Sequence, residues 1–365
     1  MTQQKTSTRQ TTSYLKGLAI LLVLVTHYSS AYASGLYDRL IRDYAGFVVS
    51  IFFILSGYGI YYSLRRLEEH YGGKPLSFRL MGTFFWQRAL RVYPLYWLSL
   101  LSASYILGNV WEQFHTFSFR TLATYMAFPT IRPPGYAWFI PELVQCYLVA
   151  PFLYYLLRKL HHWRYMAFIA ALGAVFTVIT VYFWQLLDAI NGFGVPDPYS
   201  LLYRSMFLSN ILLFAAGLYM PVLIHDVKKY ASNYTTVAFF AAFLASLYFV
   251  RDEFFQLNGQ TSQLVLFPLF LISVSGFCLS AIAANRPLPL NRPVAWLGGF
   301  SFTLYLFHWQ YYTLLEKAGL INDSEWQSAL ATIALFPIFM AACMVLQWAA
   351  NRVRLLLDRP AVKKA

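Results

Sequence analysis

A lysine and a histidine share one apolar stretch near the start of the chain, YLKGLAILLVLVTHYSS at residues 14–30. Lys16 and His27 are separated by about three turns of an α-helix, so both side chains are expected on one face, roughly 16 Å apart along the axis. An ionisable side chain inside an apolar helix is costly and marks a candidate functional site. His27 is therefore a candidate proton acceptor. The alternative is a histidine that merely forms a hydrogen bond within a helical bundle.

Two arginines lie close together in the stretch WQRALRVYPLYW at residues 86–97. Arg88 and Arg91 are three positions apart and would share a helix face. Paired guanidinium groups suit phosphate, because each presents a planar fork of hydrogen-bond donors. The alternative is a pair of anchors whose charged ends reach the lipid headgroups.

A carboxylate lies at the start of another apolar stretch, AWFIPELVQCYLVAP at residues 137–151, and no other Asp or Glu lies between Glu112 and Asp188. A carboxylate can orient an imidazole, select its tautomer and raise its basicity. Glu142 is therefore a candidate catalytic partner of His27. The alternative is a carboxylate at the water interface with no partner.

Two further motifs are candidates for lining a pocket. His308, in SFTLYLFHWQYY, either faces the same pocket as His27 or bonds a backbone carbonyl to cap the bundle. Ser56, Gly57 and Tyr58 precede a second glycine, and small residues let neighbouring helices approach closely. The same segment would leave room for a slender ligand, although packing alone accounts for the glycines.

The elements that must position these residues are membrane spans. The composition is 59% hydrophobic and only 12% charged, whereas soluble domains have about 25% charged residues. A span needs about 20 mostly apolar residues. The sequence predicts an all-α polytopic transmembrane bundle over one domain, residues 1–365, with about ten spans. The predicted spans are 14–34, 44–64, 89–107, 138–158, 164–184, 206–224, 234–250, 263–284, 295–316 and 327–351.

The charges predict the orientation of these spans. Most of the 28 Lys and Arg residues fall in the segments that share a side with the N-terminus, which places the N- and C-termini in the cytoplasm. The net charge of +13 thus reflects topology, and we expect no nucleic acid partner. This orientation puts Lys16 and the arginines at the cytoplasmic surface, and His27 past the midplane towards the outside. Two long loops, 65–88 inside and 108–137 outside, are candidates for binding ligands.

No metal site is predicted. The three cysteines lie inside apolar runs without a partner at metal-ligand spacing, which favours neither zinc nor a disulfide framework. They are expected to pack as small core residues.

The motifs together, in this order, resemble those of the acyltransferase family 3 integral-membrane proteins. The resemblance rests on the Lys16–His27 spacing, the SGY of helix 2, an RxxR before YP, a WF…E…Y…P segment and a late SxxLYLxH. The residues that carry these motifs are Lys16, His27, Ser56, Gly57, Tyr58, Arg88, Arg91, Tyr93, Pro94, Trp138, Phe139, Glu142, Tyr147, Pro151, Ser301, Tyr305 and His308.

This resemblance implies an O-acyltransferase of the bacterial cytoplasmic (inner) membrane, without the fused SGNH hydrolase-like domain that many relatives carry. The implied acyl donor is cytoplasmic acyl-CoA, with acetyl as the default group, and the implied acceptor is an extracytoplasmic carbohydrate. In this reading His27 is a general base oriented by Glu142. The donor contacts Lys16, Arg88, Arg91, Ser56, Gly57 and Tyr58, and the possible pocket residues are Trp138, Tyr305 and His308.

Two other classes share this composition. A transporter or flippase for a lipid-linked sugar would more often show repeated halves and broken helices, and the sequence shows neither. A polysaccharide polymerase or ligase would be expected to place its arginines and its longest loop outside, whereas Arg88 and Arg91 are predicted inside.

Overall fold

The computed structural model describes ten parts of the chain. They are residues 2–32, 36–73, 76–106, 137–165, 167–169, 171, 210–255, 260–285, 290–322 and 324–358. All regular structure in these parts is helical, which confirms the predicted fold class. All but the last residue of the predicted outer loop 108–137 and most of the predicted span 164–184 lie outside the described residues.

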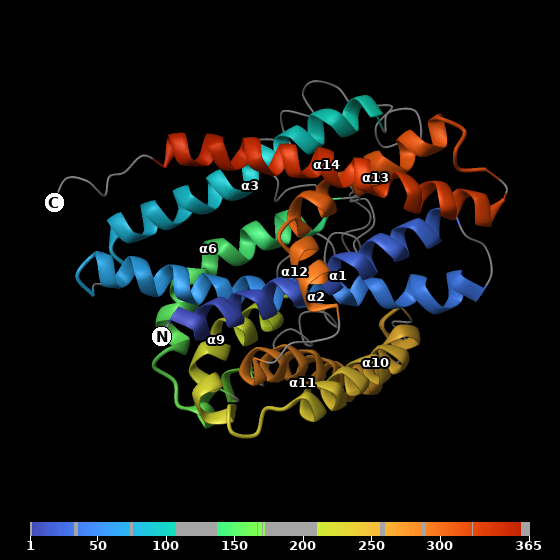
Figure 1. The fold of residues 1–365 in the computed structure, drawn as a ribbon. Helices are drawn as coiled ribbons and strands as arrows, with labels where there is room; N and C mark the ends of the chain where they lie inside the picture. Colours follow the sequence, from blue (N-terminus) through green and yellow to red (C-terminus); the bar gives the residue numbers. More distant parts are fainter. Residues whose placement is uncertain are drawn as a thin grey trace, which may run out of the picture.

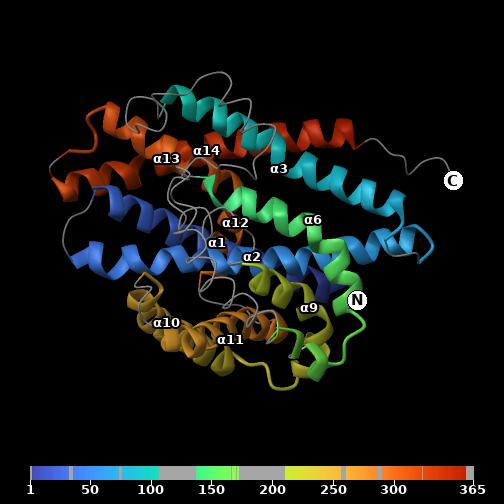
Figure 2. The same cartoon turned by 180° about the vertical axis from the view of Figure 1, so that it is seen from behind.

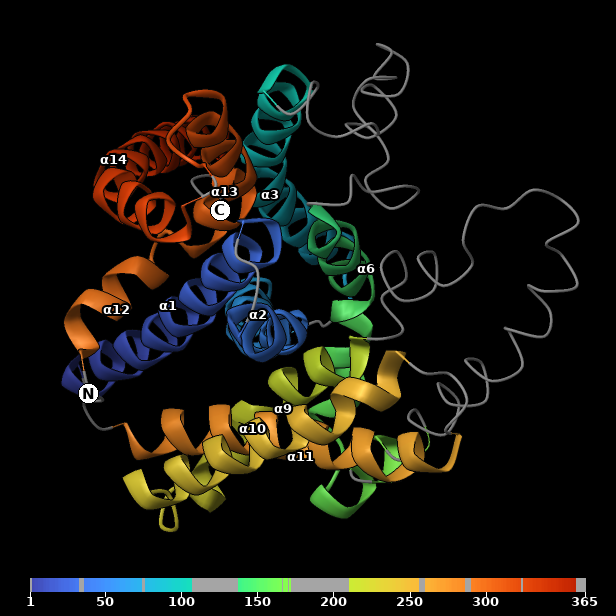
Figure 3. The ribbon, with the colours of Figure 1, turned by 90° about the vertical axis from the view of Figure 1, so that its right-hand side faces the viewer.

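Helices α1 (Thr2–Tyr32) and α2 (Leu36–His70) form the centre of the bundle. On one side lie α3 (Phe78–Ile106), α13 (Ser301–Lys317) and α14 (Glu325–Leu357), and on the opposite side lie α9 (Ile211–Val227), α10 (Asn233–Phe255) and α11 (Gln260–Ala284) (Figures 1 and 3). The remaining helices are α6 (Phe139–Leu157) on one flank and the short α12 (Asn291–Gly298), which packs along α1.

Three described segments are long and apolar enough to cross a membrane: Val48–His70, Phe139–Leu157 and Glu325–Leu357. Two shorter apolar helices, Ile211–Val227 and Leu269–Ala284, accompany them. On α14 large apolar side chains face outwards, with Ile333 71% and Trp348 61% exposed. Such a surface suits lipid rather than water. The protein is a polytopic membrane protein.

Glycines allow α2 and α9 to cross in backbone contact. A Cβ added at Gly57 would lie 2.1 Å from the carbonyl oxygen of Phe214, and one at Gly217 would lie 1.9 Å from that of Ile54. These distances are too short for any side chain. Gly57 therefore has a packing role, which was the alternative that the sequence left open.

A second crossing joins α1 to α12. A Cβ at Gly17 would lie 1.8 Å from the carbonyl oxygen of Val294, and one at Gly298 would lie 1.7 Å from that of Ser13. Gly17 of α1 and Gly298 of α12 thus allow the segment next to Lys16 to pack in backbone contact with α12.

The predicted span 295–316 is wrong in its first part, because the chain turns between α12 and α13. The amide of Gly299 donates to the carbonyl of Trp296 at 3.0 Å, and that of Phe300 donates to Leu297 at 2.9 Å. Bonds three residues apart tighten and end a helix. Apolar residues on both sides of the turn hid it from a hydropathy count.

The first helix starts and the last helix ends at the same end of the bundle (Figures 1 and 2). The last turn of α2 and the first turn of α3 lie at this end too. In the half of the molecule that includes this end, Arg65 and Arg66 of α2 line a cavity with the N-terminal half of α1, and Arg88 of α3 contacts Ser63 of α2.

Candidate active site

Two histidines meet between α1 and α13. Nδ1 of His27 lies 2.6 Å from Nε2 of His308, although 281 positions separate them in the sequence. Their ring planes are 10° from parallel and the ring centroids are 4.7 Å apart. The two rings therefore face each other through their nitrogen-bearing edges, because the centroids are farther apart than the two nitrogens by about the width of one ring. His308 is fully buried, whereas His27 is only half-buried.

His308 also bonds its own helix. Its Nδ1 lies 2.7 Å from the carbonyl oxygen of Tyr305, one turn earlier. The sequence left open whether His308 faces the same pocket as His27 or bonds a backbone carbonyl. The structure shows a carbonyl bond and, in addition, a direct contact with His27 that sequence reasoning missed.

Aromatic rings surround this pair. The Trp309 ring lies 5.3 Å from the ring of His27, and Tyr28 packs edge-on against Tyr312 at 5.7 Å. The Tyr312 hydroxyl donates to the carbonyl of Leu24 at 2.8 Å, which ties α13 to α1. Aromatic packing and this hydrogen bond therefore hold the two helices in the register that brings the histidines together.

Glu142 is fully buried in the first turn of α6. Its Oε2 accepts a hydrogen bond from Nδ2 of Asn210, just before α9, at 2.5 Å. The amide of Phe139, one turn earlier, donates to the hydroxyl of Tyr305 at 3.3 Å, so the start of α6 lies beside the histidine pair. Sequence reasoning missed Asn210, because a single asparagine carries no spacing signal. A carboxylate in a first turn is also favoured by the helix dipole.

Of the other predicted pocket residues, Trp138 is half-buried directly before α6, and Tyr305 is buried beside His308. The hydroxyl of Tyr305 meets α6 and its carbonyl meets His308. Tyr305 therefore links the element that carries Glu142 to the element that carries His308.

The predicted phosphate-binding cations lie apart from the histidine pair, with Lys16 at the middle of α1 and Arg88 and Arg91 on α3. Arg91 is exposed and lies within electrostatic reach of both Lys16 and Arg88. Nη2 of Arg88 donates to the Ser63 hydroxyl at 3.2 Å, and its guanidinium lies 5.6 Å from the centre of the Phe84 ring. Cations held this close repel one another unless an anion joins them.

A cavity of about 970 Å³ opens beside Lys16, between α1, α2, α9 and α11. Tyr58 and Gly59 line it, while Ser56 is half-buried on the same helix. Its wall carries five cations, Arg9, Lys16, Arg65, Arg66 and Lys228. The one carboxylate in the wall, Glu69, is paired with Arg65 at 3.0 Å. Sequence reasoning had not assigned Arg9, Arg66 and Lys228 to this site, because only their charge marked them.

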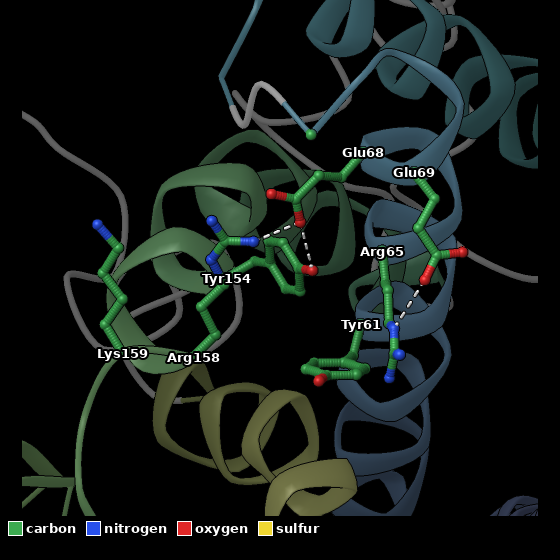
Figure 4. A pocket seen from close by; sticks show the side chains of 8 residues that line it. Tyr61, Arg65, Glu68, Glu69, Tyr154, Arg158 and Lys159 are labelled. Carbon is green, nitrogen blue, oxygen red and sulfur yellow. Dashed lines mark hydrogen bonds and ion pairs between the residues drawn. The ribbon is translucent and has the colours of Figure 1, made fainter.

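A smaller cavity of about 530 Å³ adjoins the first and shares Arg65 and Glu69 with it (Figure 4). Here Glu68 of α2 pairs with Arg158 and accepts a hydrogen bond from the Tyr154 hydroxyl at 2.9 Å. The charges of this cavity largely neutralise one another. The larger cavity, with its excess of cations, is the better site for a multiply charged anion.

Metal ligands are not gathered in the part of the chain that the structure describes. There, no group of three or more His, Cys, Asp or Glu side chains is placed to hold an ion. The three cysteines are buried and reduced, as their apolar surroundings predict.

Comparison with known proteins gives one match. Searches of curated proteins and of solved structures return no significant similarity. A family model described as an acyltransferase domain, that of acyltransferase family 3, matches residues 13–348. The match begins before Lys16 and ends beyond His308, so it includes every site residue that the sequence predicts. The protein therefore belongs to acyltransferase family 3, a family of membrane acyltransferases.

Proposed function

We propose that the protein transfers an acyl group, by default acetyl, from cytoplasmic acyl-CoA to a hydroxyl of an extracytoplasmic carbohydrate. The observation that carries this proposal is the arrangement along α1. The N-terminal half of α1, up to Lys16, borders a cation-lined cavity, and His27 in the C-terminal half meets His308. A helix joins a site suited to phosphate with a site suited to proton transfer.

The donor's charged head binds at the end that we orient to the cytoplasm from the charge bias. CoA carries several phosphates on a long, thin arm that ends in a thioester. Lys16, Arg88 and Arg91 hold these phosphates, and the cavity cations Arg66 and Lys228 extend the same site. The arm then follows α1 past Tyr58 towards His27. This orientation corresponds to a bacterial inner membrane with the acceptor outside.

At the other end, His27 removes the proton from the acceptor hydroxyl. The hydroxyl oxygen attacks the thioester carbon, the carbon–sulfur bond breaks, and the CoA thiolate takes the proton back from His27. We propose direct transfer rather than a covalent acyl-histidine. In direct transfer the half-buried ring of His27 only accepts and returns one proton and need not carry the acyl group itself.

Glu142 supports this step through its charge. The imidazole of His27 becomes positive while it holds the proton, and the negative charge of the buried Glu142 would stabilise that state. Asn210 holds the carboxylate by its Oε2, which keeps Glu142 fixed in the first turn of α6.

The acceptor is proposed to be a glycan from the aromatic surroundings of His27. Trp309 and Tyr28, both half-buried, present flat, partly polar rings beside His27. Rings of this kind combine an apolar face with a polar edge, as sugar rings require. An exopolysaccharide, an O-antigen unit and a lipid-linked sugar all fit this chemistry.

Mass spectrometry of cell-surface glycans tests the function. Cells that carry the gene should show an acyl group that is lost on gene deletion and restored by the wild-type chain. A His27→Ala chain should insert at normal levels and fail to restore it, since a general base contributes about 10²–10⁴-fold in rate. Normal acylation by His27→Ala would overturn the proposal.

A further inference from the structure

The histidine pair is part of a longer chain of hydrogen bonds. The carbonyl of Tyr305 lies 2.7 Å from Nδ1 of His308, and Nε2 of His308 lies 2.6 Å from Nδ1 of His27. His308 has both of its ring nitrogens in these contacts, so the proton on one of its nitrogens determines the role of the other.

The first group in this series of hydrogen bonds, the Tyr305 carbonyl, can only accept a hydrogen bond. A backbone carbonyl has no proton, so Nδ1 of His308 must carry the hydrogen in their bond. A second proton on His308 would place a positive charge on a fully buried ring inside a membrane bundle, which is unfavourable. His308 is therefore neutral, and its Nε2 accepts.

The unprotonated Nε2 of His308, which accepts a hydrogen bond, determines the tautomer of His27. Nδ1 of His27 must donate to Nε2 of His308, because their contact needs one proton. In a neutral imidazole the other nitrogen is then unprotonated. Nε2 of His27 thus carries the lone pair that a general base requires.

The aromatic neighbours keep His308 in place. Its ring lies 6.0 Å from the ring of Tyr312, which packs edge-on, and 5.7 Å from that of Trp309. We infer that His308 is a positioning residue that holds His27 with Nε2 unprotonated, a role in which it takes the place of a carboxylate. This inference rests on the proposed function, in which His27 is the base.

Two substitutions separate positioning from packing. His308→Leu removes the acceptor, and His308→Gln offers an amide oxygen in its place. We expect kcat to fall about 10²-fold in His308→Leu, with acyl-CoA affinity changed less than about twofold, and to recover in part in His308→Gln. A matched control is Gln310→Leu on the same helix. Gln310 is also buried, but its amide donates to the Ser99 carbonyl on α3, so kcat should stay near wild type.

Nitrogen-15 spectra of histidine-labelled protein test the tautomer directly, with the His27 signals assigned by their loss in His27→Ala. The wild type should show Nε2 of His27 unprotonated, and His308→Leu should show a mixture of tautomers. Wild-type kcat in His308→Leu, or an unchanged tautomer, would overturn the inference. If His27→Ala is inactive while His308→Leu is fully active, only this inference fails; if His27→Ala is active, the proposed function fails.

Discussion

His27 combines two properties that rarely occur together on a membrane helix. It is half-buried, and its Nδ1 contacts a fully buried partner, which orients its ring. At the scale of single residues, the proposed catalysis depends on the contacts that hold this ring. Glu142 is the other residue whose role can be tested at this scale.

Glu142→Gln should lower kcat at least tenfold while changing acyl-CoA affinity little. The amide keeps the shape of the side chain but removes the charge that stabilises a protonated His27. Steady-state kinetics with varied acyl-CoA, combined with direct donor binding, measures both effects. Asn210→Ser is the companion variant, because it leaves the carboxylate in place without its 2.5 Å hydrogen bond. A Glu142→Gln enzyme that loses donor binding but keeps kcat would remove Glu142 from the catalytic step.

Helix crossings at glycines decide the geometry of the cavity. Gly57 and Gly217 bring α2 against α9, and both helices contribute residues to the cation-lined wall. Gly57 of the SGY motif therefore shapes the proposed donor cavity through the packing of α2 against α9. Tyr58, the next residue, turns towards the cavity, where its hydroxyl lies 3.5 Å from that of Tyr62.

Gly57→Val should destabilise the protein by about 1–3 kcal/mol, since the new side chain must push the two backbones apart. The readout is the midpoint of thermal unfolding in detergent. Gly82→Ala is the control on α3, because a Cβ there meets nothing within 4 Å. That change should be neutral or stabilising by up to about 1 kcal/mol. Equal midpoints for the two variants would show that the close crossing is absent.

The polar residues of the proposed site divide between the two ends of the whole molecule. The first helix starts and the last helix ends at one end of the bundle (Figure 1), and the cation-lined cavity borders the half of α1 that begins there. The histidine pair lies farther along α1, and the outward face of α14 meets lipid on the flank. One bundle thus carries both the cavity proposed for the donor and the histidine pair proposed for proton transfer.

Acetyl-CoA should stabilise the whole protein against heat. At 100 times the dissociation constant, binding adds about 2.7 kcal/mol, which corresponds to a rise of a few degrees in the unfolding midpoint. The rise should disappear in Arg88→Ala/Arg91→Ala and shrink in Arg66→Ala/Lys228→Ala. Arg352→Ala is the control, because this exposed arginine stacks on Trp348 outside the cavity wall. Acetyl-pantetheine, which lacks the phosphates, should shift no variant. A full shift in both double variants would place the donor elsewhere.

Much of this protein is determined locally in the sequence. The apolar runs identify the helices, and the helical period places Lys16 and His27 on one helix, which α1 confirms as continuous over Thr2–Tyr32. The motifs in order also indicate the family. These properties depend on residues close together in the chain, so periodicity and hydropathy are enough to predict them. Within the described residues, local prediction failed at Gly299, where apolar residues on both sides hid a turn, and in the predicted loop 65–88, most of which belongs to α2 and α3.

Contacts between distant residues were decided by the tertiary structure alone. His27 meets His308 because Tyr312 and the aromatic rings around it fix α13 against α1, and Glu142 meets Asn210 because α6 packs beside α9. The sequence favoured Glu142 as the partner of His27, since a carboxylate is the commoner partner of an imidazole. Which side chain reaches Nδ1 depends on helix rotation and crossing angle, and these follow from packing over the whole bundle rather than from any spacing in the chain.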